Sequence, residues 1–331
     1  LLSAQPVLDQ NAVLRTHTQR KSHASRIVPS MSTIKRQHYV PQFYLRGFAL
    51  PDGAEKLHVY DKPRRQKFVA GVKDVASRRY YYDTPEVAAM AKVPQAVEKW
   101  LGVHEQTVAP ILAATLDSLA AGTFRGFTDE EKIELATFIA IQHIRTEEAR
   151  ERTAQLYDSF PQEILDAFPE VYATARAART REGRAKFHVE LLLSSVVSRV
   201  AAVLAARSWV VLQRTQTPWL FFTSDNPVSV VSLRDDGLAV GPCSPGVEVS
   251  MPLSPDYMLS IVPIPYPLKV APCSREDVRR FNLIRIDSAT AQVFSQNGDF
   301  RLVEKRIDEF PEIANPKRQR VTTNGGPRRN G

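Results

Sequence analysis

Residues 37–48 read Gln37-His38-Tyr39-Val40-Pro41-Gln42-Phe43-Tyr44-Leu45-Arg46-Gly47-Phe48 and place four aromatic residues, a histidine, an arginine and two amides within twelve positions. Val40 precedes a proline, which biases its backbone toward extended geometry. In an extended segment alternate side chains point to opposite faces. His38 therefore faces one side with Val40 and Gln42, and Tyr39 faces the other side. The stretch predicts an extended arm that forms one wall of a polar site.

His38 is the first candidate catalytic group in this arm. Phe43, Tyr44 and Phe48 are expected to anchor the segment, so that the imidazole sits on a rigid support. A histidine with a pKa near neutrality can act as a general acid or base, or can bind a metal. The alternative is a structural histidine that caps a turn. We take Tyr39, its neighbour, as a candidate ligand-binding residue.

The second wall is predicted at Phe222-Thr223-Ser224-Asp225-Asn226-Pro227, a turn that directly follows an apolar run. Loops at strand ends often carry function, because the sheet fixes them while the loop exposes them. Asp225 is a candidate catalytic carboxylate, and Ser224 and Asn226 are candidate ligand-binding residues. Ser224 lacks the flanking glycines of a nucleophile elbow. The alternative is that these residue types simply make a turn.

Gln142 and Arg145 lie three positions apart on a predicted helix, so they occupy one face. Gln142 continues the apolar side of that helix, where a polar group must be hydrogen-bonded. Arg145 could bind an anion with two parallel hydrogen bonds, or form an internal salt bridge to Asp225 or Glu105. Glu105 is a candidate pocket acid on the preceding helix, whereas Glu98 is expected on a solvated face.

The order of predicted elements indicates an α+β fold. A hairpin over 57–70 follows the arm, a helical region covers about 94–207, and short apolar runs from Trp209 onward predict a mainly antiparallel sheet that the hairpin joins. Thr128 to Glu131 has the pattern of a capping box. A segment over 186–207 reads as one long apolar helix.

Charge divides the chain into a body and two basic tails. The net charge is +8 over 331 residues. Residues 1–30 hold four Lys/Arg against one acid, and residues 304–331 hold seven against four, which leaves 33 against 31 for residues 31–303. We expect a single domain over 31–303 between a disordered appendage and a disordered basic tail, with Met31 as the natural start. A body near neutrality argues against a large phosphate-binding surface.

Several classes of protein are disfavoured by what the sequence lacks. Cys243 and Cys273 form neither a disulfide framework nor a metal knuckle and read as free thiols in a reducing cytosol. No apolar run has the length of a membrane helix. No Walker loop or His-Glu-x-x-His motif is present. We predict no cofactor; a divalent metal held by His38, Glu105 and Asp225 is the alternative.

The combination of His-Tyr-Val-Pro at 38–41 with Thr-Ser-Asp-Asn-Pro-Val at 223–228 resembles the bacterial family known as domain of unknown function 4238. Gln142-x-x-Arg145 and Asn282 extend the resemblance, which covers the chain from His38 to about Ser295. It implies an architecture and points to residues, and it implies no activity.

Three functions follow as hypotheses. The first is a cytoplasmic hydrolase of phosphodiesters, phosphodiesterase- or nuclease-like, in which His38 is the general base or acid, Asp225 orients it and Arg145 stabilises anionic charge. The second is a module that binds a small anionic ligand or a peptide without turnover. The third is a buried polar network with a structural role. A small anionic ligand and a nucleic acid are the partners left open, and the sequence does not indicate an oligomeric state.

Overall fold

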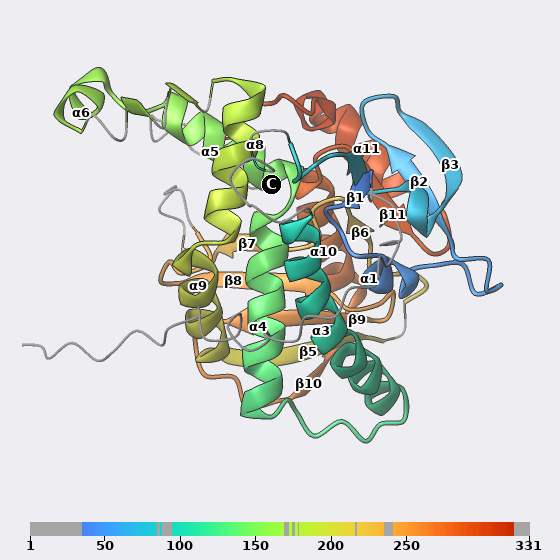
Figure 1. Ribbon diagram of the computed structural model, residues 1–331. Coiled ribbons are helices and arrows are strands. Elements are labelled where there is room, and N and C mark those ends of the chain that lie inside the picture. The colour runs from blue at the N-terminus through green and yellow to red at the C-terminus, as the bar shows by residue number, and fades with distance from the viewer. Residues whose placement is uncertain are drawn as a thin grey trace, which may run out of the picture. The chain divides into compact units, whose positions relative to one another are not determined.

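Figure 1 shows the computed structural model, which describes residues 35–84, 87, 95–168, 172–173, 176–177, 179–215, 217–234 and 241–320. Within these residues the predicted α+β class is confirmed: an N-terminal hairpin precedes a helical middle, and a mostly antiparallel sheet follows it. The predicted appendage over 1–30 and the start at Met31 lie outside the described residues.

The opening motif forms a strand and then a helix. β1 (Arg36–His38) pairs antiparallel with β4 (Ser77–Arg79), and α1 (Gln42–Arg46) follows at once. The prediction of extended geometry is therefore wrong beyond Pro41. Pro41 is extended, with φ −63° and ψ 143°, and stands at the N-cap of α1, where a residue without an N–H loses no helical hydrogen bond. Tyr44 and Phe48 are buried and anchor the motif as expected.

The first hairpin pairs with the C-terminal strand Gln292–Ser295, but in a four-stranded sheet separate from the five-stranded sheet that holds most of the C-terminal strands, so the prediction that it joins that main sheet is wrong. The hairpin strands pair antiparallel, and the four-stranded sheet has the order β3-β2-β11-β6. The members are β2 (Lys56–Asp61), β3 (Gln66–Gly71), β11 (Gln292–Ser295) and β6 (Thr223–Ser224). A 3-10 turn, η2 (Val72–Asp74), connects β3 to β4. Strand β11 thus places the predicted turn at Asp225 beside the N-terminal hairpin.

The helical middle contains α3 (Ala96–Ala120), α4 (Asp129–Ile144), α5 (Glu147–Asp158), α6 (Gln162–Ala167), α8 (Arg181–Leu192) and α9 (Ser195–Ala205). The prediction of a single helix over 186–207 is wrong, because the chain breaks between α8 and α9. The side chain of Ser194 accepts a hydrogen bond from the Val196 N–H and so caps α9, which is a typical way for serine to start a new helix.

The five-stranded sheet has the order β10-β5-β9-β8-β7 and is antiparallel except for the β10–β5 pair. Its strands are β5 (Ser208–Arg214), β7 (Ser229–Ser232), β8 (Val247–Pro252), β9 (Tyr257–Val262) and β10 (Val270–Cys273). Figure 1 shows α4 and α9 lying across one face, where they share a core with residues of β5, β8 and β9. Helix α10 (Arg275–Ser288) covers the other face, where Phe281 packs with Met258 and Cys273. Strand β8 is buried along its length, as expected for a strand covered on both faces.

The first part of the predicted disordered tail over 304–331 forms regular structure. Residues from 304 onward continue α11 (Arg301–Glu309) and then form η3 (Pro311–Ala314). Val303 and Ile307 bury the apolar face of α11. Beyond η3, Arg318 and Arg320 both pair with Glu148 of α5, at 3.0 and 2.9 Å. Arg318 and Arg320, which the sequence placed in a solvated tail, therefore form ion pairs with the folded body. Residues 321–331 lie outside the described part.

No single helix in the described ranges is long and apolar enough to cross a membrane. Helices α8 and α9, bent by 49° at their break, satisfy that test of length and composition only when they are taken together.

The predicted capping box at the start of α4 is confirmed. Thr128 Oγ1 accepts from the Glu131 N–H at 3.2 Å, and the Thr128 N–H donates to Glu131 Oε2 at 2.9 Å. Thr128→Ala should therefore lower the free energy of unfolding by about 1 kcal/mol, measured by urea denaturation. Thr137→Ala, within the same helix, is the control and should change stability by less than about 0.5 kcal/mol. Equal losses in both variants would contradict a capping role.

Candidate functional site

Arg145 stands at the C-terminal end of α4, is 1% exposed, and binds three separate segments. Its Nη1 donates to Glu105 Oε1 at 2.8 Å, its Nη2 to the His38 carbonyl at 2.6 Å, and its Nε to the Tyr82 hydroxyl at 3.2 Å. The internal salt bridge to Glu105, one of the two alternatives from the sequence, is the one that the structure contains. Each of the three guanidinium nitrogens thereby donates to a partner within the protein.

Gln142 acts one turn earlier on the same face of α4. The side chain is fully buried, and its Nε2 donates to the Tyr39 carbonyl at 2.9 Å. Together with Arg145 it holds the backbone of residues 38–39 against the helix. Gln142 and Arg145 therefore both donate hydrogen bonds to backbone carbonyls of the opening motif.

The side chain of His38 is half-buried. Its Nε2 lies 3.1 Å from the Lys73 carbonyl. Burial lowers the pKa of His38, while the Lys73 carbonyl acts in the opposite direction. The neighbouring Tyr39 ring is buried and packs on Tyr81 at 5.2 Å between centroids. The imidazole thus fits the alternative of a structural histidine.

Asp225 is 1% exposed and caps a strand entrance. Its carboxylate accepts from the Thr290 N–H at 2.9 Å, the Ala291 N–H at 2.7 Å and the Gln292 N–H at 2.9 Å. Burial raises its pKa, and the nearby Lys62 ammonium opposes that shift. The carboxylate is already occupied by backbone donors, so it neither orients His38 nor faces an open site.

Ser224 and Asn226 complete a buried turn. Ser224 Oγ donates to the Asn226 carbonyl at 2.9 Å and accepts from the Asn226 N–H at 3.1 Å. Asn226 Oδ1 accepts from Thr146 Oγ1 at 3.1 Å, and its Nδ2 donates to the Ser288 carbonyl at 3.0 Å. The turn therefore joins the α4–α5 junction to the end of α10.

The sequence did not reveal Lys62, which is fully buried near Asp225. Its Nζ donates to the carbonyls of Ile286 and Ala289 at 2.7 and 2.6 Å, at the end of α10. Burial lowers its pKa. Lys62 stands in an Asp-Lys-Pro-Arg-Arg segment that reads as an exposed turn, so no local signal could identify it.

The predicted site residues therefore converge on a buried polar network. A cavity of about 320 Å³ lies elsewhere among the residues that the structure describes. None of the eight predicted residues, His38, Tyr39, Glu105, Gln142, Arg145, Ser224, Asp225 and Asn226, is among its described lining. We call this cavity the basic pocket.

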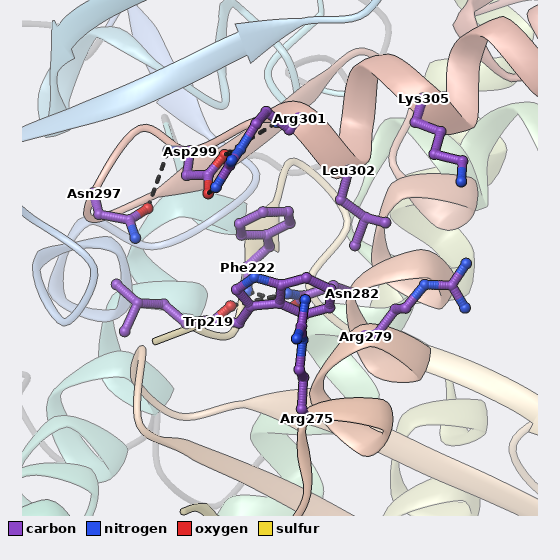
Figure 2. Close-up of a pocket in the computed structure, with 11 residues that line it drawn as sticks. Trp219, Phe222, Arg275, Arg279, Asn282, Asn297, Asp299, Arg301, Leu302 and Lys305 are labelled. Carbon is purple, nitrogen blue, oxygen red and sulfur yellow. Dashed lines mark hydrogen bonds and ion pairs between the residues drawn. The ribbon is translucent and has the colours of Figure 1, made fainter. Parts of the chain in front are cut away.

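Figure 2 shows that the basic pocket has an aromatic and aliphatic centre with charged groups around it. Its lining comes from the loop before β6, the first half of α10, and the start of α11: Trp219, Leu220, Phe222, Arg275, Arg279, Asn282, Asn297, Asp299, Arg301, Leu302 and Lys305. Four of these residues are basic and one is acidic. A concave apolar site with a few convergent polar groups is the usual form of a small-molecule site.

Asn282 fixes the inner wall of the basic pocket. Its Oδ1 accepts from the Phe222 N–H at 2.8 Å, and its Nδ2 donates to the Leu220 carbonyl at 2.8 Å. Arg275 lies over the Trp219 ring, 4.4 Å from its centroid. The sequence resemblance pointed to Asn282, but no spacing pattern linked it to the cations of α11.

A comparison with protein-family models matches residues 36–299 to the family described as "Protein of unknown function (DUF4238)". The chain belongs to this family. The resemblance seen in the sequence is thereby confirmed, and membership in DUF4238 carries no activity with it. No curated protein and no solved structure matches the chain. The function of this DUF4238 protein is therefore inferred from its geometry alone.

Metal binding was the alternative for His38, Glu105 and Asp225. Within the described ranges, no group of three or more His, Cys, Asp or Glu side chains is arranged to hold a metal ion. Their side chains also serve different segments: the imidazole meets Lys73, Glu105 meets Arg145, and Asp225 meets residues 290–292.

The role of Arg145 can be tested through stability. Arg145→Met leaves the His38 carbonyl, the Tyr82 hydroxyl and the partly exposed Glu105 carboxylate without their donor, and each buried polar group left without a partner costs about 1–3 kcal/mol. We expect a loss of this size in chemical denaturation. Arg199→Met, at an exposed position of α9, is the control and should change stability little. A loss below about 1 kcal/mol for Arg145→Met would favour a ligand-binding role instead.

Glu98 is partly buried, although the sequence predicts it on a solvated face of its helix. Burial raises its pKa from 4.5 to about 7, and no described group bonds its Oε1. The native state therefore binds more protons at this group than the unfolded state between about pH 4.5 and pH 7. Its contribution to the free energy of unfolding must fall as pH rises through that window.

Glu98→Gln removes this contribution. The stability of the variant relative to wild type should increase from pH 4.5 to pH 7.5, as measured by denaturant titration at both pH values. Glu130→Gln, at an exposed position on α4, should show no comparable increase. A pH-independent difference between Glu98→Gln and wild type would show that the carboxyl group is not perturbed by burial.

Proposed function

We propose that this protein binds a small anionic ligand with an apolar or aromatic body in the basic pocket. The observation that carries the proposal is the union of Arg275, Arg279, Arg301 and Lys305 around Trp219 and Phe222 in one cavity. The cations come from two helices separated in sequence, so their meeting is a property of the fold.

The apolar centre and the basic rim favour different parts of one ligand. Burial of an aromatic or aliphatic group against Trp219, Leu220 and Leu302 supplies non-directional affinity. Arginine side chains supply charge-assisted hydrogen bonds to an anionic group and fix its orientation. A neutral apolar ligand would leave the Arg279 side chain without a partner among the described residues, and an inorganic anion would leave the apolar wall uncovered.

Hydrolysis of a phosphodiester, a nucleic acid included, stays a prediction, as do a peptide ligand, a cytoplasmic location and a bacterial source. The geometry supports binding in preference to hydrolysis, because the carboxylate of Asp225 and the guanidinium of Arg145 are occupied by internal partners. The described lining of the basic pocket contains one carboxylate, Asp299, and it is paired with Arg301.

Binding can be measured by calorimetric titration of the full chain with benzoate, phenyl sulfate, phenyl phosphate and the neutral analogue phenol. We expect at least one anion to bind and phenol to bind at least tenfold more weakly. Arg279→Gln should weaken the anion by about tenfold, which corresponds to the loss of one charge-assisted contact. Arg199→Gln is the matched control, because it removes an exposed arginine on α9. Failure of every anion to bind, or equal binding by Arg279→Gln, would overturn the proposal.

A further inference from the structure

The four cations of the basic pocket are unequally neutralised. Arg301 is fully engaged: its Nε and Nη2 donate to the two oxygens of Asp299 at 2.8 and 2.6 Å. Lys305 lies 3.8 Å from Glu309, one turn further along α11. Arg275 is held over the Trp219 ring. The side chain of Arg279 makes no hydrogen bond or ion pair with any residue that the structure describes.

The cations with the weakest internal pairing lie on different helices. Figure 2 shows Arg279 of α10 and Lys305 of α11 at the same end of the cavity, with Asp299 and Arg301 toward the other end and the Trp219 and Phe222 rings between them. An anion at the Arg279–Lys305 end would therefore be held from two sides, while a ring attached to it would extend over Trp219.

We propose that the ligand of the basic pocket is an aryl or nucleoside phosphate monoester, with its phosphate between Arg279 and Lys305 and its ring against Trp219. This inference rests on the proposed function and names the ligand class of the same site. The cavity of about 320 Å³ lies at the small end of the range for ligand sites, which fits a single small ligand and not a polymer.

The charge of the site favours a phosphate over a carboxylate. A phosphate monoester carries a charge between about −1.5 and −2 near pH 7 and offers three acceptor oxygens. An arginine can take two of these oxygens, and a lysine binds the group as a point charge. A carboxylate has one charge and two coplanar oxygens, so it would satisfy Arg279 and offer less charge than a phosphate to Lys305, which Glu309 pairs at 3.8 Å.

Asn297, at the end of the cavity away from Arg279 and Lys305 (Figure 2), adds a neutral hydrogen-bond donor. Asn297 Oδ1 accepts from Ser295 Oγ at 2.8 Å and from the Asp299 N–H at 3.1 Å. This fixes the amide so that Nδ2 carries the donors, and Nδ2 has no hydrogen-bond partner among the described residues. A ring with a hydrogen-bond acceptor at its edge, such as a nucleobase, would accept a hydrogen bond from Asn297 Nδ2.

The decisive comparison uses phenyl phosphate and phenyl sulfate, which share a shape and differ in charge. In calorimetric titration of the full chain at pH 7.5, phenyl phosphate should bind at least about tenfold more tightly than phenyl sulfate. Lowering the pH to 5.5 should remove most of this preference, because the second ionisation of a phosphate monoester has a pKa near 6. Binding of phenyl sulfate should change little.

Substitutions test which residues cause the preference for phenyl phosphate over phenyl sulfate. Lys305→Gln and Arg279→Gln should each reduce the phosphate-to-sulfate ratio toward one, whereas Arg199→Gln should leave it unchanged. Trp219→Leu should weaken phenyl phosphate toward the affinity of inorganic phosphate. Equal affinity for phenyl phosphate and phenyl sulfate would overturn this inference while the proposed anion binding stands. Absence of binding by both ligands and by benzoate would overturn the inference and the proposed function together.

Discussion

The hydrogen bonds of the buried Arg145 guanidinium are the interactions on which the fold of this protein depends. An arginine loses its hydration when it is buried, so it must recover hydrogen bonds from the protein. Arg145 recovers them from α3 through Glu105, from the opening motif through the His38 carbonyl, and from the segment after β4 through Tyr82. One side chain thereby fixes three segments that are far apart in the sequence.

The same physical requirement recurs at two further buried charges, Asp225 and Lys62. Asp225 takes three backbone N–H groups at the entrance of β11, and Lys62 takes two carbonyls at the end of α10. Each charge satisfies main-chain groups that a turn or a helix end leaves unpaired. Three polar residues of the family motifs, Gln142, Arg145 and Asp225, therefore satisfy buried backbone groups.

Helix α10 connects this network to the basic pocket. Its last turn is held by Lys62 and by Arg285, whose Nη1 donates to the Asn226 carbonyl at 2.7 Å. Its middle is held by Asn282 against the strand entrance at Phe222. With both points fixed, the first half of the helix presents Arg275 and Arg279 toward α11. Stability and the proposed binding site thus use different parts of one helix, which is why substitutions can separate them.

Local patterns in the sequence determined the class and order of elements. Alternation marked the hairpin, the Thr128 to Glu131 pattern marked the start of α4, and the density of polar groups marked residues 38, 142, 145 and 225 as special. These features depend on neighbours within a few positions, where hydrogen bonding and periodicity act directly.

Only the tertiary structure decided what those residues contact. It placed the His38 carbonyl, and not its imidazole, against Arg145, and it buried Lys62. It also brought Arg279 and Lys305 to one cavity, through the packing of Ile286 on α10 with Val303 and Ile307 on α11. Such meetings depend on how apolar faces far apart in the sequence pack together, and no short-range pattern contains that information.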